Sequence, residues 1–279
     1  MSERRLFTEA ELTEALNEIG SNLERKISIY LLGGCAMTFI GRKAATKDVD
    51  LVLTSTEDVK ALSYAAEQAG FHYVQELPEE YDALGAWVIM ENEAGMRLDV
   101  FDRQVSHGLI IDEDMRKRAG LYGSFGNLDV YLMSNEDIFL FKGITERESD
   151  LEDLRMLAET GLNWETIEKE CLAQEESGTW AYRLWSRLME LRSRYGINTP
   201  IAGRLRDHSD LELIKRVFTD IIGERRTSFS EVADEIGRRY GYSSSWTRQQ
   251  LKILATQGIL VVEKEGRRNT YRVSPENRT

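Results

Sequence analysis

The sequence is poor in the residues that hold secreted and metal-stapled proteins together. Its 279 residues include two cysteines, three prolines and three histidines. Cys35 and Cys171 stand far apart, and neither has a Cys or His neighbour at metal-ligand spacing. A disulfide scaffold, a structural zinc site and a secreted location are therefore not expected.

Long hydrophobic segments are also lacking. No apolar run approaches the roughly 18 residues that a membrane helix requires. The first residues, MSERRLFTEAEL, have no signal-peptide core. The sequence therefore predicts a soluble, cytoplasmic protein without a membrane partner.

The sequence has fewer basic than acidic residues, and the basic residues are unevenly distributed along the chain. The protein has 36 Lys and Arg against 48 Asp and Glu, and the net charge of −12 argues against a generally basic nucleic-acid-binding surface. Residues 201–279 nevertheless hold 15 basic and 11 acidic side chains, whereas residues 1–200 hold 21 and 37. Gly, Asn and Pro interrupt the helical pattern at 195–200, so we expect two modules with different partners.

Hydrophobic spacing and capping residues predict the secondary structure. Apolar residues three and four apart predict a helix over 8–23, and Ser55 with Asp58 has the spacing of a capping box. Ser134 is placed like the N-cap of a helix, and helical patterns continue to residue 194. The expected strands cover 27–32, 49–53, 71–75, 86–90, 96–101 and 128–132.

These elements predict the fold class and the domain order. Strands and helices alternate up to residue 133, which is typical of an α/β (α+β) domain. A helical extension is expected over 134–200, and a separate domain is expected over 205–279.

Acidic residues on predicted strands form the main candidate site. Asp48 and Asp50 are two residues apart, so a strand directs both side chains to one face, with Cα atoms roughly 7 Å apart. Asp99 has similar strand-like surroundings, and Gly33 and Gly34 leave room for phosphates near the backbone. Mg²⁺ prefers oxygen ligands, and two ions about 3.5–4 Å apart can activate an attacking oxygen and stabilise a leaving phosphate. The alternative is a solvated strand end, which is the commoner setting of an isolated Asp-x-Asp.

The run GGCAMTFIGRKAATKDVDLVL resembles the first motif of the nucleotidyltransferase superfamily. Within it, the run is most similar to minimal nucleotidyltransferases and to AbiEii-type toxins of type IV toxin–antitoxin systems. The resemblance implies that Asp48 and Asp50 are catalytic and bind two Mg²⁺ ions. It implies a third catalytic, metal-binding carboxylate at Asp99, with Asp102 as the other option. The residues it places under the triphosphate of an NTP are Gly33 and Gly34.

The segment FKGITERESDLEDL, residues 141–154, is similar to the Lys…Arg…Asp-x-x-Asp-Leu segment of AbiEii-type proteins. The resemblance implies a nucleotide-binding role for Lys142, Arg147 and Asp150. Lys142 could reach a triphosphate as a point charge, with Asp153 in the surrounding polar network. The alternative is a solvated helix face with charge pairs three residues apart.

The segment SFSEVADEIGRRYGYSSSWTRQQLKILATQGILVVEKEGRRNTYRV resembles a winged helix-turn-helix domain. Ser228 and Glu231 have capping-box spacing, and three predicted helices precede a predicted hairpin. Residues 238–272 hold eight Lys and Arg against two Glu, which favours nucleic-acid binding. Winged helices also mediate protein contacts and dimerisation, so that alternative stays open. The implied nucleic-acid contacts are Ser244, Ser245, Arg248, Gln249, Arg267 and Arg268.

Two functional hypotheses follow. The first is a Mg²⁺-dependent nucleotidyltransferase that transfers NMP from an NTP to an RNA acceptor, with tRNA as one option, or to a protein. Its resemblance implies a toxin-like role, an antitoxin or a homo-oligomer as partner, and tRNA or operator DNA on the winged helix. The second is a catalytically silent sensor that regulates transcription through DNA binding.

Overall fold

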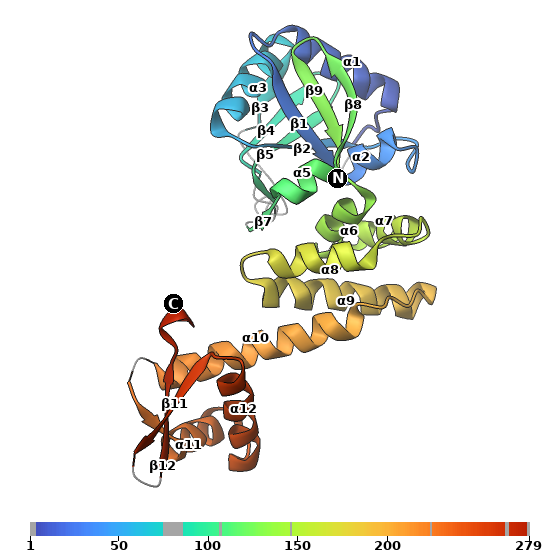
Figure 1. Cartoon of the computed structure of the whole chain (residues 1–279). Helices are drawn as coiled ribbons and strands as arrows, with labels where there is room; N and C mark the ends of the chain where they lie inside the picture. Colours follow the sequence, from blue (N-terminus) through green and yellow to red (C-terminus); the bar gives the residue numbers. More distant parts are fainter. Residues whose placement is uncertain are drawn as a thin grey trace. The chain divides into compact units, whose positions relative to one another are not determined.

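The computed structural model of the chain separates into two compact units, Met1–Gly203 and Arg204–Thr279, and each is described by itself (Figure 1). Within the described part of the chain, no helix is long and apolar enough to cross a membrane. The structure describes residues 4–74, 86–105, 108–145, 147–223, 225–265 and 268–277.

A seven-stranded mixed sheet organises the N-terminal unit, in the order β3-β4-β5-β2-β1-β9-β8. β1 is antiparallel to β2 and parallel to β9, while β2 is parallel to β5. β6 and β7 pair separately as a short hairpin. The strands are β1 (Ile27–Leu32), β2 (Asp48–Leu53), β3 (Phe71–Tyr73), β4 (Val88–Asn92), β5 (Arg97–Asp102), β6 (Gln104–Val105), β7 (Leu109–Ile110), β8 (Gly120–Phe125) and β9 (Leu128–Leu132).

Two amphipathic helices cover one face of this sheet. α1 (Glu9–Ser21) and α3 (Thr56–Gln68) contact each other and the strands beneath them. Thr8 opens α1 with a capping box. Ser55 accepts a hydrogen bond from the backbone N–H of Asp58 at 3.1 Å, so the predicted cap of α3 is confirmed. The caps fix where each helix starts and therefore which side chains face the sheet.

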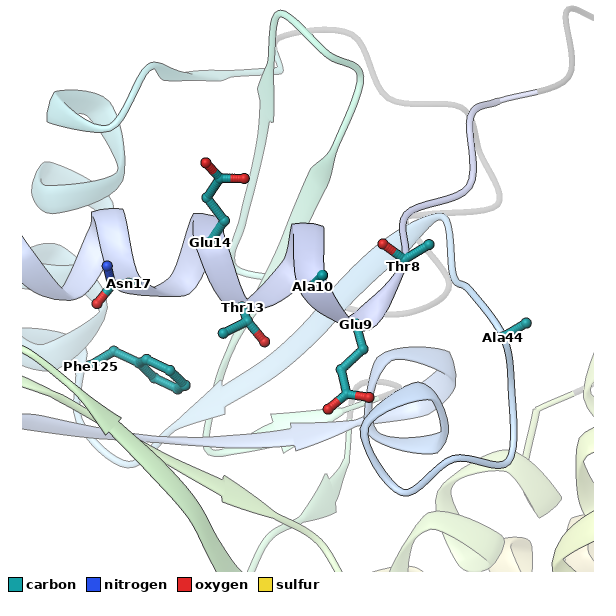
Figure 2. A pocket seen from close by; sticks show the side chains of 8 residues that line it. All are labelled: Thr8, Glu9, Ala10, Thr13, Glu14, Asn17, Ala44 and Phe125. Atoms are coloured by element: carbon teal, nitrogen blue, oxygen red, sulfur yellow. The ribbon is translucent and has the colours of Figure 1, made fainter.

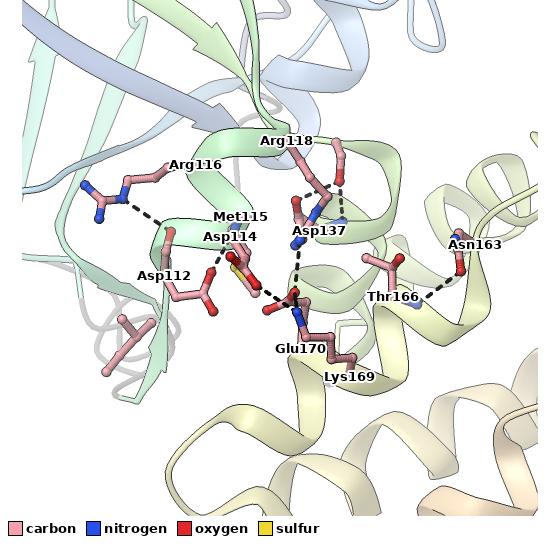
Figure 3. A network of polar contacts seen from close by, with 12 residues as sticks. Asp112, Asp114, Met115, Arg116, Arg118, Asp137, Asn163, Thr166, Lys169 and Glu170 are labelled. Atoms are coloured by element: carbon pink, nitrogen blue, oxygen red, sulfur yellow. Dashed lines mark hydrogen bonds and ion pairs between the residues drawn. The ribbon is translucent and has the colours of Figure 1, made fainter.

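Helices dominate the rest of the N-terminal unit, as predicted for its second part. Ser134 accepts a hydrogen bond from the backbone N–H of Asp137 and starts α6, as expected. Arg118 joins three helices, because its guanidinium lies 2.7 Å from Asp137 and 2.9 Å from Glu170 (Figure 3). The helices are α2 (Gly33–Phe39), α5 (Glu113–Arg118), α6 (Asn135–Gly143), α7 (Glu148–Ala158), α8 (Trp164–Ala173) and α9 (Ser177–Tyr195).

Three helices and a three-stranded sheet form the C-terminal unit, with strand order β10-β12-β11. The capping box of Ser228 and Glu231 opens the second helix as predicted. Phe218, Val232 and Leu251 are fully buried and belong to one apolar core. The elements are α10 (Ala202–Ile222), β10 (Thr227–Ser228), α11 (Phe229–Tyr240), α12 (Ser244–Thr256), β11 (Leu260–Glu265), β12 (Arg268–Val273) and the short 3-10 helix η1 (Pro275–Asn277).

Several elements of the N-terminal unit were not predicted from the sequence pattern, among them the short elements β6, β7 and α5. The edge strand β8 was not predicted, because it contains Gly120 and Gly123 and lies largely exposed, so it has no apolar alternation. α2 begins at Gly33, directly after β1. Gly33 has φ +66°, a conformation that glycine adopts without strain, and so it joins β1 directly to the helix.

Candidate active site

Three acidic residues meet where β1 ends and where β2 and β5 begin. Leu32 at the end of β1 pairs with Asp50, and Asp50 pairs in turn with Asp99. Paired strands lie about 4.8 Å apart, and paired residues direct their side chains to the same face. Asp48 lies two residues before Asp50, and the intervening Val49 is buried, so the expected alternation is confirmed. The sheet therefore brings the three predicted carboxylates to one end of adjacent strands.

The glycines between β1 and α2 are fitted closely to this acidic group. A Cβ atom on Gly33 would lie 2.0 Å from Oδ2 of Asp50. A Cβ atom on Gly34 would lie 2.8 Å from Oγ1 of Thr46. Glycine is therefore required at position 33, because the backbone angle there is positive and because the Asp50 carboxylate occupies the space of a side chain.

Burial and mutual repulsion favour protons on two of these carboxylates. Burial first, and repulsion from Asp48 second, raises the pKa of Asp50 to about 6. Burial first, and repulsion from Asp50 and Asp48 next, raises the pKa of Asp99 to about 8. Asp99 is 1% exposed, and its Oδ1 atom has no hydrogen-bond partner among the described residues. A cation at this point would relieve the repulsion and satisfy the buried oxygen.

An arginine that the sequence patterns did not identify lies in the same group. Phe7 and Thr46 form an antiparallel bridge with backbone hydrogen bonds of 2.7 and 3.0 Å. This bridge brings the N-terminal segment beside β2, where Nη2 of Arg4 lies 2.6 Å from Oδ1 of Asp48. No motif indicates this contact, because it depends on a pairing between segments far apart in sequence.

The acidic group fits a hard cation in its chemistry, but its ligands are not preassembled. All its donors are carboxylate oxygens, which Mg²⁺ prefers, and the unsatisfied Oδ1 of Asp99 is a free ligand atom. Across the described residues, however, no three His, Cys, Asp or Glu side chains converge as a metal-binding group. The ion pair of Asp48 with Arg4 is one reason, because it engages the carboxylate that lies nearest to the strand end.

The predicted phosphate lysine lies in a buried ionic network. Nζ of Lys142 lies 2.7 Å from Asp150 and 2.7 Å from Asp153. Thr145 donates a hydrogen bond of 2.6 Å to the second oxygen of Asp150. Lys142, Asp150 and Asp153 are all buried, so they do not form a solvated helix face. Burial alone would lower the pKa of Lys142, but the two carboxylates raise it overall, so the ammonium stays charged.

Two further basic residues border the network. Lys43 in the loop after α2 lies 2.7 Å from Asp153, a contact between residues 110 positions apart. Arg147 has an exposed side chain at the start of α7, and its charge lowers the pKa of Asp50 against the larger effect of burial. The network is therefore electrostatically linked to the acidic group on β2. Sequence patterns placed Arg147 here but gave no role to Lys43.

The region that contains these residues, apart from Arg4, matches a known protein family. The family model described as "Nucleotidyltransferase of unknown function (DUF6036)" matches residues 7–187. The chain belongs to this family. The match begins before α1 and ends within α9, so it includes both the acidic group and the Lys142 network. No curated protein matches the chain.

A surface hollow in this nucleotidyltransferase-family protein lies away from the acidic group. It has a volume of about 730 Å³ and runs along α1. Figure 2 shows Glu9 and Thr13 on the side of α1 that faces Phe125. None of the candidate catalytic carboxylates lines it. The candidate active site is therefore assigned to the carboxylates and not to this hollow. The lining residues are Thr8, Glu9, Ala10, Thr13, Glu14, Asn17, Ala44 and Phe125.

The predicted nucleic-acid contacts lie beyond the family match, on the C-terminal unit. Helix α12 buries Thr247, Leu251 and Leu254 and presents a polar face opposite them. The guanidinium of Arg248 stacks over the ring of Phe229 at 4.0 Å. Arg267 lies outside the described residues, and Arg268 is placed only as the first backbone residue of β12. The exposed polar face carries Ser244, Ser245, Arg248 and Gln249.

Proposed function

We propose that this protein is a Mg²⁺-dependent nucleotidyltransferase that transfers NMP from an NTP to an acceptor hydroxyl. The observation that supports it most is the pairing of Asp50 with Asp99 inside the region matched by the family. A buried and a half-buried carboxylate with raised pKa values on adjacent strands are costly for folding, and a catalytic role explains their presence.

The metal would be held by Asp48, Asp50 and Asp99. A bound Mg²⁺ would supply charge neutralisation at the phosphates and polarise the phosphorus that is attacked. Gly33 allows the Asp50 carboxylate to lie beside the turn, because a side chain at position 33 would displace that carboxylate. Gly34 lets the same turn lie close to Thr46 and leaves its backbone open to a phosphate.

The proposed reaction forms one bond and breaks another at the α-phosphorus. The acceptor oxygen bonds to that phosphorus, the bond to the β-phosphate oxygen breaks, and pyrophosphate leaves. Oδ1 of Asp99 is the candidate acceptor of the hydroxyl proton, since it has no other partner among the described residues.

We propose that the C-terminal unit binds nucleic acid through the polar face of α12. Its helix and sheet order resembles a winged helix, in which such a helix enters the major groove. The partner is either the RNA acceptor itself, for example a tRNA, or operator DNA. Loss of binding in Arg248→Ala and Gln249→Ala, with retained binding in the exposed α10 variant Leu213→Ala, is the expected result in a gel-shift titration.

Label transfer tests the catalytic proposal. The full-length protein is incubated with Mg²⁺, total RNA and each α-labelled NTP in turn. Label is expected on RNA or on protein, and it should be absent with Asp48→Asn/Asp50→Asn. Asp114→Asn is the matched control, because Asp114 is exposed and its ion pair with Lys169 lies at the surface. Unchanged transfer by the double variant would disprove the assignment of the site.

A regulatory function is the second candidate, and the Arg4–Asp48 ion pair favours it. A guanidinium already neutralises Asp48, and the carboxylates do not converge for a metal within the described part of the chain. In this case the N-terminal unit would be a silent sensor, and the C-terminal unit would bind operator DNA. Selection of a specific duplex, together with no Mg²⁺ or NTP binding, would favour the regulator over the enzyme.

A further inference from the structure

Two lysines share one carboxylate oxygen beside the acidic group. Oδ2 of Asp153 lies 2.7 Å from Nζ of Lys142 and 2.7 Å from Nζ of Lys43. The side chain of Lys142 is 9% exposed, whereas that of Lys43 is 30% exposed. The two ammonium groups therefore neutralise the same residue from different sides, one from the interior and one from the surface.

The interior lysine pairs with two buried carboxylates. Lys142 lies between Asp150 and Asp153, and both carboxylates are buried. Moving its ammonium to a phosphate would break two ion pairs with buried carboxylates and would leave Asp150 without its lysine partner, which is unfavourable. Its position therefore suits it to hold the two aspartates in place.

The surface lysine lies beside the glycine turn. The backbone N–H of Lys43 donates a hydrogen bond to Met37 of α2 at 3.1 Å, which fixes the loop against the helix. Its Nζ atom lies 3.9 Å from the point where Gly34 would carry a Cβ atom. A Cβ atom on the neighbouring Gly33 would lie 2.0 Å from Oδ2 of Asp50. Lys43 thus places an ammonium next to the turn that borders the candidate catalytic aspartate.

We infer that Lys43, and not Lys142, contacts the phosphates of the nucleotide, while Lys142 acts as a positioning residue beneath it. An ammonium has three donors, and one contact with Asp153 leaves donors for a phosphate oxygen. Asp153 keeps its ion pair with Lys142 when Lys43 turns to the ligand, so the exchange breaks only the more exposed of the two contacts of Asp153. The inference rests on the proposed function, because it assigns a phosphate-binding residue to that site.

Calorimetric titration of the full-length protein with ATP, CTP, GTP and UTP, each with Mg²⁺, tests this assignment. Lys43→Met should weaken the preferred NTP by about tenfold or more, equal to about 1.4 kcal/mol. The affinity for the corresponding NMP should change by less than about twofold. Lys43→Arg should stay within about threefold of wild type, since a guanidinium also donates to phosphate. Arg42→Met is the matched control, because Arg42 is the exposed preceding residue of the same loop.

Lys142→Met separates the two roles. Loss of a positioning residue should lower the melting temperature and weaken NTP and NMP in similar proportion, because the whole pocket is disturbed. A loss confined to triphosphates in Lys142→Met, or equal NTP affinity in Lys43→Met and Arg42→Met, would overturn the inference. Failure of the wild-type protein to bind any of the four NTPs would instead reject the proposed function, and the inference with it.

Discussion

At the scale of single residues, Gly33 links backbone conformation to the candidate chemistry. It has φ +66°, and a Cβ atom there would lie 2.0 Å from the Asp50 carboxylate. Gly33→Ala should therefore lower the free energy of unfolding by about 1–2 kcal/mol, which is the cost of this conformation for an L-residue. It should also displace Asp50. Gly41 has φ +71° with open space around it, so Gly41→Ala carries the backbone cost alone.

Chemical denaturation and label transfer distinguish these two effects. Both glycine variants should lose free energy of unfolding through the backbone cost, and Gly33→Ala should lose more because its Cβ atom also displaces Asp50. Label transfer should fall sharply only in Gly33→Ala. Equal activity in the two variants would show that the Asp50 position next to the turn does not matter for transfer.

The acidic group also predicts how stability depends on pH. Asp99 has a pKa near 8 in the folded protein, above its ordinary value, so between about pH 4 and 8 the folded state binds more protons than the unfolded state. This residue therefore makes the metal-free protein less stable as the pH rises through that range. In EDTA, Asp99→Asn should raise the melting temperature by several degrees at pH 8 and by much less at pH 5. A difference that is the same at both pH values would contradict this assignment.

At the scale of elements, buried ion pairs fix how the helices pack. Arg118 of α5 compensates Asp137 of α6 and Glu170 of α8, and both acids are 1% exposed (Figure 3). Ser134 also donates a 2.7 Å hydrogen bond to Asp137, which connects the cap of α6 to the same cluster. One guanidinium therefore connects the three helices through ion pairs with two buried carboxylates.

Removal of that guanidinium should be costly. Arg118→Met is expected to lower the free energy of unfolding by about 3–5 kcal/mol, because it removes the guanidinium that pairs with two buried carboxylates. Lys117→Met is the control, since Lys117 of the same helix pairs with Glu113 at the exposed surface and such pairs contribute about 0–1 kcal/mol. Urea denaturation followed by circular dichroism measures both. A loss in Arg118→Met no larger than in the control would show that the cluster is dispensable.

At the scale of the whole molecule, the division into two units predicts independent folding. The C-terminal unit has its own apolar core, which includes Phe218, Leu251 and Leu254. A fragment of residues 201–279 should unfold cooperatively, although a domain of this size buries little surface and is marginally stable. Leu251→Ala should cost about 2–5 kcal/mol and unfold the fragment, whereas the exposed variant Leu213→Ala should leave its melting curve unchanged. A fragment without a thermal transition would contradict the division.

Local patterns determined much of the architecture. The caps at Ser55, Ser134 and Ser228 and the alternation around Asp48 and Asp50 are short-range features, and the structure has all of them. Capping and strand alternation depend on residues two to four positions apart, so a single sequence contains the information. The acidic residues on strands, and the resemblance they carry, also pointed to the nucleotidyltransferase superfamily, which the description of the matched family supports.

Other features depended on contacts across the chain. The bridge between Phe7 and Thr46 decided that Arg4 reaches Asp48, and the packing of α7 against the loop after α2 decided that Lys43 reaches Asp153. Sequence spacing carries no information about such pairs, because their separation is set by how strands and helices assemble. The sequence by itself therefore determined which residues could do the chemistry. Only the tertiary structure decided which charges neutralise each other, since burial and distance, which control that neutralisation, arise only on folding.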